Sequence, residues 1–240
     1  MWWRGNNRLR TCRVVLSAEK QAFRLDSCVD YFKIAARLIR IYGSVPQCIP
    51  YRSGRALPPL FLFLELTYRC NLRCPYCYVY SAGKKPRLAE HEELTADEIA
   101  GIVDQTPPWT LVFLSGGEPL ARKDLNEIVA KTAKKRLCHI YTNGTAIGQA
   151  DAEQWVTAGV SSVAFSVDGS EAVHDSIRGK GTFSTTMCAV EMLSEAKKRK
   201  RKQFPLINLR STITARNAGD LRAMARVAER QVPITARSRR

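Results

Sequence analysis

The sequence lacks an apolar run long enough to cross a membrane. Its longest candidate, residues 57–66, contains Glu65, whereas a spanning helix needs about 20 mostly apolar residues. The arginines within the first ten residues are not followed by the apolar stretch of a secretion signal. These absences exclude an ordinary membrane-spanning segment and predict a cytoplasmic protein.

The sequence also lacks a second Cys-x-x-Cys pair, although it contains eight cysteines. Three of these, Cys70, Cys74 and Cys77, lie within eight residues of one another. Without a secretion signal, this crowding indicates metal ligation by reduced thiols before disulfide bonding. For most of the scattered cysteines we expect burial as small apolar side chains: Cys12, Cys28, Cys48, Cys138 and Cys188.

Acidic residues are scarce, and the resulting net charge of +16 first suggests a nucleic acid or an anionic membrane surface as partner. The basic excess lies in residues 1–55, in the run 197–202 and in the last four residues. A solvated helix end explains the 197–202 run, and no nucleic-acid-binding motif accompanies it. We therefore expect no nucleic-acid partner, and keep a nucleic-acid surface as an alternative.

The chain divides by pattern into a helical lead segment, residues 1–55, and a main domain, residues 56–240. The lead segment could dock on the domain, lie on a membrane surface or contact a partner. In the main domain, nearly continuous apolar runs are typical of strands buried on both faces of a parallel sheet. These runs lie at 60–66, 110–114, 138–142, 162–167 and 206–213.

Helical segments are expected after each of these strands. Thr95 and Glu98 have the spacing of a capping box at a helix start. Asp124, Asp151 and Asn217 are expected to cap later helices. Strand–helix alternation predicts an α/β fold whose parallel sheet is open or curled into a barrel. Ligands of such sheets bind at the carboxyl ends of the strands.

The three crowded cysteines follow the first expected strand, at spacings of four and three residues. A cubane iron–sulfur cluster has four irons that each take one external ligand. Three thiolates would therefore leave one iron open to a substrate or cofactor. A structural zinc site is the alternative, but it needs a fourth protein ligand, and the nearest candidate, His91, lies in an acidic stretch.

With Tyr76 as the aromatic residue, the cysteine spacing resembles the CxxxCx(aromatic)C motif of the radical S-adenosylmethionine (SAM) superfamily. Further segments in family order each follow an expected strand, although each alone is also a turn signal. Those segments are Ser115-Gly116-Gly117-Glu118-Pro119, Thr142-Asn143-Gly144, Ser166-Val167-Asp168-Gly169 and the stretch from His174-Asp175 to Arg178-Gly179. The resemblance covers roughly residues 60–217.

The resemblance implies a [4Fe-4S] cluster on the three cysteines, with SAM chelating the open iron. Reductive cleavage of SAM would give methionine and a 5′-deoxyadenosyl radical that takes a hydrogen atom from substrate. Tyr76 would lie beside the adenine, Gly117 and Glu118 would face the methionine amino group, and Asp168 and Arg178 would help to hold ribose and carboxylate. The full implied cofactor-binding set is Tyr76, Gly116, Gly117, Glu118, Asn143, Ser166, Asp168 and Arg178.

The resemblance also implies a partial parallel (β/α) TIM-like barrel with five of the usual six strand–helix units. Residues 231–240 fall where a sixth unit would begin but carry almost no apolar pattern, so we interpret the C-terminus as truncated. SPASM-type relatives mostly modify peptides or proteins, which implies a peptide or protein substrate and a one-electron donor such as flavodoxin or ferredoxin. The alternatives are a catalytically incomplete cluster-binding remnant and a zinc-stabilised nucleic-acid-binding protein.

Overall fold

The computed structural model describes residues 58–80 and 93–231. The expected lead segment, His91 and the positions after Gln231 lie outside these ranges, so the expectations that concern them stay predictions. No helix within the described ranges is both long and apolar enough to cross a membrane.

Five strands in the described ranges form one parallel sheet in chain order, and each pairs with the next. The predicted α/β fold is confirmed, and the five strands are not closed into a barrel. The strands are β1 (Phe61–Glu65), β2 (Leu111–Ser115), β3 (Leu137–Thr142), β4 (Ser162–Ser166) and β5 (Leu206–Arg210).

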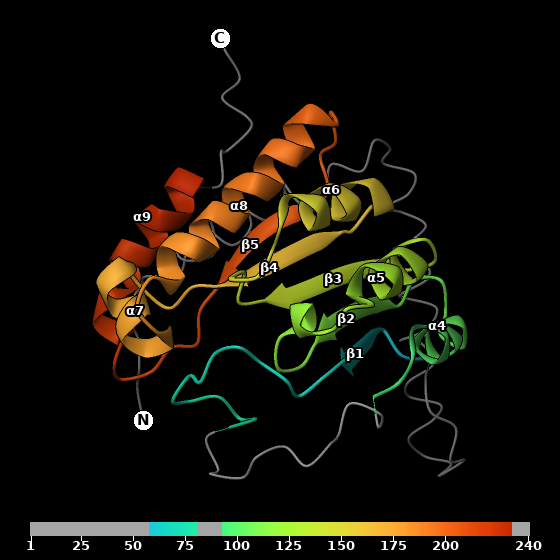
Figure 1. Cartoon of the computed structure of the whole chain (residues 1–240), viewed down its shortest axis with the longest axis horizontal. Helices are drawn as coiled ribbons and strands as arrows, with labels where there is room; N and C mark the ends of the chain where they lie inside the picture. The colour runs from blue at the N-terminus through green and yellow to red at the C-terminus, as the bar shows by residue number, and fades with distance from the viewer. Residues whose placement is uncertain (1–57, 81–92, 232–240) are drawn as a thin grey trace, which may run out of the picture. The chain divides into compact units, whose positions relative to one another are not determined.

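Helices follow the strands, and α4, α5, α6 and α8 lie side by side along one face of the sheet (Figure 1). The α-helices are α4 (Ala96–Asp104), α5 (Leu125–Ala133), α6 (Gln149–Ala158), α7 (Glu171–Arg178), α8 (Thr182–Arg199) and α9 (Leu221–Gln231). Two short 3-10 helices are η2 (Pro119–Ala121) and η3 (Ala218–Asp220). The sequence pattern does not predict α7 as a separate helix.

The core fills the space between these helices and the sheet. Alternate residues of the central strands are fully buried there, including Val112, Ile140 and Phe165. On the other face of β1, Phe61 is 56% exposed and Phe63 is 59% exposed. The expectation that every strand is buried on both faces is therefore wrong for β1, whose residues alternate between partly buried positions on the helix side and exposed positions on the other side.

The expected helix caps have different outcomes. Thr95 and Glu98 form the predicted capping box at the start of α4. Asp124 precedes α5 but makes no cap hydrogen bond, because its carboxylate pairs with the Arg122 guanidinium at 2.6 Å and 2.9 Å. Helix α6 begins two residues before Asp151, whose carboxylate accepts the amide of Gly148 at 2.9 Å from inside the first turn. The predicted caps at Asp124 and Asp151 are therefore wrong in detail.

Replacing Thr95 by alanine removes the hydroxyl that accepts the Glu98 amide. We expect a loss of about 1 kcal/mol in the free energy of unfolding, measured by denaturant titration. Thr95→Ser retains the hydroxyl and is the control, so it should lose much less. Equal losses in the two variants would contradict a capping role.

Candidate cofactor site

The cysteine loop, defined here as residues 66–80, leaves the carboxyl end of β1 and runs beneath the ends of the neighbouring strands (Figure 1). Cys70, Cys74 and Cys77 are free and partly buried. The Cys77 amide donates to the Cys74 carbonyl at 3.1 Å, and the Tyr80 amide to the Cys77 carbonyl at 3.0 Å. These consecutive turns order the segment from Cys74 to Tyr80, at the edge where ligands of parallel sheets bind.

N–H groups point at two of the sulfurs. The Leu72 amide lies 3.4 Å from Cys70 Sγ, and Asn143 Nδ2 lies 3.9 Å from the same atom. Arg178 Nη1 lies 3.9 Å from Cys74 Sγ. Burial raises the pKa of Cys70 and Cys74, and the guanidinium of Arg178 opposes that rise at Cys74. N–H groups at cysteine sulfurs are among the features that tune an iron–sulfur cluster.

The donor set fits a cluster with one open iron. Among the residues that the structure describes, no three Cys, His, Asp or Glu side chains are arranged to hold a single metal ion. That finding concerns one-ion sites, because a cubane cluster binds each cysteine at a different iron. Metal binding would take the three thiols as thiolates and release their protons.

The two adjacent glycines after β2 meet the cysteine loop directly. A Cβ atom on Gly116 would lie 2.4 Å from the Thr67 carbonyl oxygen, and one on Gly117 would lie 2.3 Å from that of Arg69. The amides of Gly117 and Glu118 donate to those same carbonyls at 2.6 Å and 2.8 Å. The glycines therefore allow the backbone of the cysteine loop to pack against the turn, and their approach to a cofactor stays a prediction.

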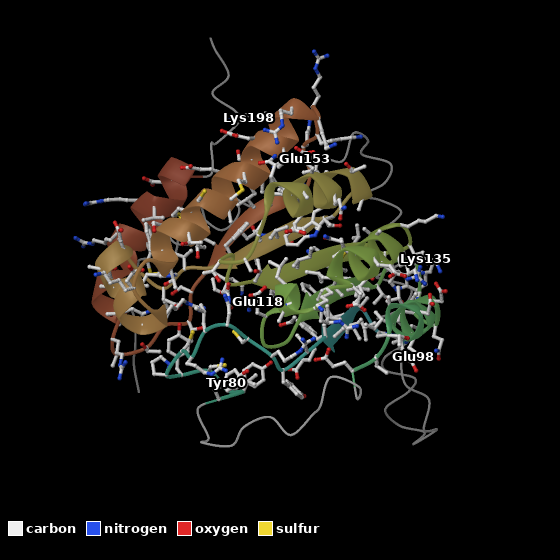
Figure 2. The ribbon with its side chains drawn as sticks, in the orientation of Figure 1. Tyr80, Glu98, Glu118, Lys135, Glu153 and Lys198 are labelled. Carbon is white, nitrogen blue, oxygen red and sulfur yellow. The ribbon has the colours of Figure 1, made fainter. Side chains whose placement is uncertain are left out.

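Glu118 lies at the carboxyl end of the sheet (Figure 2) and is 2% exposed. Its carboxylate accepts the Thr142 hydroxyl at 2.8 Å, the Asn143 amide at 2.7 Å and the Leu120 amide at 3.2 Å. Burial raises the pKa of Glu118, and these donors oppose the rise. The side chain thus ties the segment after β2 to the segment after β3. Its predicted contact with a methionine amino group remains a prediction.

Asn143 joins the segment after β3 to the cysteine loop. Its Nδ2 donates to Asn71 Oδ1 at 2.9 Å, and Asn71 Nδ2 donates to the Thr145 hydroxyl at 2.8 Å. The Thr186 hydroxyl, from α8, donates to the Asn143 carbonyl at 2.8 Å. The sequence motif includes Asn143 but does not predict its partners Asn71 and Thr186, because no local pattern links residues so distant in sequence.

Asp168 is completely buried, and several segments supply its donors. The Tyr76 hydroxyl and Arg178 Nε both donate to Oδ2, while the Thr212 amide donates to Oδ1 at 3.0 Å and the Ser211 hydroxyl at 3.4 Å. Burial, followed by the bond to Asp168, raises the pKa of Tyr76. The predicted residues Tyr76, Asp168 and Arg178 are thus brought together, with Asp168 engaged inside the protein.

Arg178 contacts both the Asp168 carboxylate and the Cys74 thiol. Its guanidinium carbon lies 5.9 Å from the centre of the Tyr76 ring. Burial, the largest single cause, would lower the pKa of Arg178, but Asp168, Tyr76 and Cys74 together raise it, so the side chain remains charged. Ser166, the last residue of β4, is only partly buried at the same strand ends. Contacts of these residues with ribose or carboxylate stay predictions.

Two residues near Asp168 have roles that their motifs did not show. Asn217 makes no cap bond at η3, so that expectation is wrong. Its Nδ2 instead donates to the carbonyls of Asp168 and Thr212 at 2.9 Å and 3.0 Å. His174 Nδ1 accepts the Asp168 amide at 3.2 Å, and its ring lies edge-on to Phe183 at 5.6 Å.

We expect Gly117→Ala to displace the cysteine loop, because its Cβ would meet backbone atoms that cannot rotate away. It should lower both the thermal stability of the protein and the iron bound per chain after anaerobic reconstitution. Gly101→Ala is the matched control, since nothing lies within 4 Å of its Cβ in helix α4, and alanine there should be neutral or stabilising. Equal iron content in both variants would contradict this role of Gly117.

We expect a fall in stability below pH 6.5 that depends on His174, because burial lowers the pKa of this side chain to about 4. Between these values the unfolded chain binds a proton that the folded chain does not, so stability falls with pH. His174→Gln retains an acceptor but does not titrate. As the pH falls, the unfolding free energy of this variant should decrease less than that of the wild type. The two decreases should differ by at most about 3 kcal/mol. Parallel pH profiles would show that His174 is not buried in its neutral form.

Known proteins of one family are similar to this chain. The model of the radical SAM superfamily matches residues 64–209. An AdoMet-dependent heme synthase of Methanosarcina barkeri is 33% identical over 68% of this chain and 45% of its own length. The PqqA peptide cyclase of Rhizobium meliloti is 31% identical over 73% of this chain and 45% of its own length.

The solved structure of native anSMEcpe with bound AdoMet has the same fold, with a TM-score of 0.57 and 20% identity, over 71% of this chain and 48% of that one. The chain spans less than half the length of the two curated relatives described above. The family model nevertheless matches more than half of this chain, over the strands and loops that carry the cysteines and the glycine turn. The chain therefore belongs to the radical SAM superfamily, a superfamily of enzymes.

Proposed function

We propose that this protein cleaves SAM reductively at a [4Fe-4S] cluster held by Cys70, Cys74 and Cys77. The observation that carries the proposal is the arrangement of three partly buried thiols on one loop, with N–H groups directed at two of the sulfurs. When bound, the cluster and SAM supply an electron and a 5′-deoxyadenosyl radical that takes a hydrogen atom from substrate. The protein itself would contribute side chains that bind and orient SAM and the substrate and that exclude water from them.

The residues around the thiols support specific roles in this proposal. Arg178 is charged and contacts Cys74, so it is suited to bind the carboxylate of a SAM molecule at the open iron. Tyr76 follows two residues after Cys74 and would lie beside the adenine. Gly117 and Glu118 form the turn against the cysteine loop, where backbone carbonyls could accept the methionine amino group.

The remaining residues of the proposed cofactor site are Gly116, Asn143, Ser166 and Asp168. Gly116 and Asn143 hold the cysteine loop from the side of β2 and β3. Asp168 holds Tyr76 and Arg178 in place, while partly exposed Ser166 is positioned to meet the ribose. In this arrangement Asp168 acts mainly as a positioning residue.

We propose a peptide or protein as the substrate. A relative named as a peptide cyclase supports this choice. The electron must come from outside the chain, and a flavodoxin or ferredoxin is the proposed donor.

Anaerobic reconstitution with iron and sulfide, followed by dithionite and SAM, tests the reaction directly. We expect chromatography to detect 5′-deoxyadenosine from the wild type and none from the triple variant Cys70→Ala, Cys74→Ala, Cys77→Ala. Cys188→Ala removes an exposed thiol elsewhere and should remain active.

A cluster that assembles without producing deoxyadenosine would replace the proposal with the cluster-binding remnant. Zinc in place of iron, together with salt-dependent binding of nucleic acid, would instead support the zinc-stabilised alternative.

A further inference from the structure

Helix α7, which carries Arg178, is capped by a residue from another part of the fold. Ser170 is its N-cap residue, but the Ser170 hydroxyl makes no cap hydrogen bond. The Ser170 amide instead donates to Oδ2 of Asp220, which is the last residue of η3 and lies 50 positions further along the chain. A carboxylate at this place also interacts favourably with the helix dipole. The start of α7 therefore depends on a contact across the fold.

The turn between β4 and α7 fits closely around the Asp220 carboxylate. A Cβ atom on Gly169 would lie 2.7 Å from Asp220 Oδ2 and 2.7 Å from Val173 Cγ1. The absence of a side chain at Gly169 therefore allows the carboxylate to reach the Ser170 amide. Because the turn leaves so little room, a longer side chain at position 220 would displace it.

The second half of α7 is tied to the start of α8, against which it packs (Figure 1). Asp175 accepts the amides of Gly181 and Phe183 at 2.6 Å and 2.9 Å. Helix α7 has eight residues, which is about 12 Å at 1.5 Å per residue, and Arg178 is the last of them. A shift at the start of so short a helix would move the guanidinium at its end.

The segment after β5, residues 211–220, also holds the partner of Arg178. The Thr212 amide donates to Asp168 Oδ1 at 3.0 Å, and Asn217 Nδ2 donates to the Asp168 carbonyl at 2.9 Å. Asp220 is the last residue of the same segment. One stretch of chain therefore positions the Asp168 carboxylate directly and the Arg178 guanidinium through α7.

We propose that Asp220 is a positioning residue for the cofactor site, because its bond to the Ser170 amide sets α7 so that Arg178 reaches the cysteine loop. The inference rests on the proposed function, which assigns the carboxylate of SAM to Arg178. Pairing between a guanidinium and a carboxylate depends on the orientation of both groups. Loss of the bond at the start of α7 should therefore weaken the binding of SAM. Since the Ser170 amide needs an acceptor at one fixed place, the length of side chain 220 should matter more than its charge.

Two conservative substitutions separate that length from the charge. Asp220→Asn keeps the length and an acceptor oxygen, so the full chain, reconstituted anaerobically with iron and sulfide, should bind SAM nearly as tightly as the wild type. Asp220→Glu keeps the charge but needs space that the turn at Gly169 does not provide. It should weaken SAM binding by about tenfold, the effect of roughly one lost hydrogen bond. Equilibrium dialysis without reductant measures both affinities.

Glu171→Gln is the matched control, since Glu171 is an exposed carboxylate in the first turn of the same helix. It removes one negative charge and should bind SAM like the wild type. Iron bound per chain should be equal in all of these proteins, and circular dichroism would confirm that each is folded. Hydrogen exchange of the metal-free proteins is the second readout, and the amides of α7 should exchange faster in Asp220→Glu than in Asp220→Asn.

Equal SAM affinities in the wild type and Asp220→Glu would overturn the positioning role, even if α7 exchanged faster in the variant. An Asp220→Asn variant that loses as much affinity as Asp220→Glu would overturn it as well, since the charge rather than the bond would then matter. A wild type that binds iron but no SAM would instead overturn the proposed function, and the inference with it. The two failures are thus distinguishable by the wild type alone.

Discussion

The buried carboxylate of Asp168 is the constraint on which the candidate site depends. A carboxylate with no exposed surface must be paired and hydrogen-bonded, because burying its charge without partners would be very unfavourable. Its donors come from three segments far apart in sequence: Tyr76 from the cysteine loop, Arg178 from α7, and Thr212 from the segment after β5. Satisfying one carboxylate therefore brings these segments together at the carboxyl end of the sheet.

The cysteine loop is held on its other side by hydrogen bonds to the turn after β2 and to the segment after β3, and by the ion pair between Arg69 and Glu93. The amides of Gly117 and Glu118 donate to the carbonyls of Thr67 and Arg69. The Asn71 side chain bonds to Asn143 and Thr145 in the segment after β3. Between the two anchors lie the three thiols. Arg178 contacts both Asp168 and Cys74. The residue that completes the buried ion pair therefore also places a positive charge beside a thiol that would have to ionise if it were to bind iron.

The sequence predicted the sheet, and it predicted that the motif residues lie together at one edge of it. Apolar runs define strands in a parallel sheet, and motifs that follow such strands must meet at one edge. The bonding partners were less predictable. Asp124 and Asn217 have the residue types of helix caps, but Arg122 and the Asp168 carbonyl offer them other bonds in the folded chain. The roles of Asn71 and Thr212 depend on contacts across the fold, which no local pattern encodes.

Hydrogen exchange of the cysteine loop tests most directly whether the Asp168 bond positions it. Exchange in residues 70–80 would be compared between the reduced, metal-free wild type and Tyr76→Phe, which loses only the hydroxyl that donates to Asp168. We expect faster exchange in this segment of the variant and unchanged exchange in helix α6. Identical exchange in the two proteins would show that the buried carboxylate does not hold the loop, and would contradict the account.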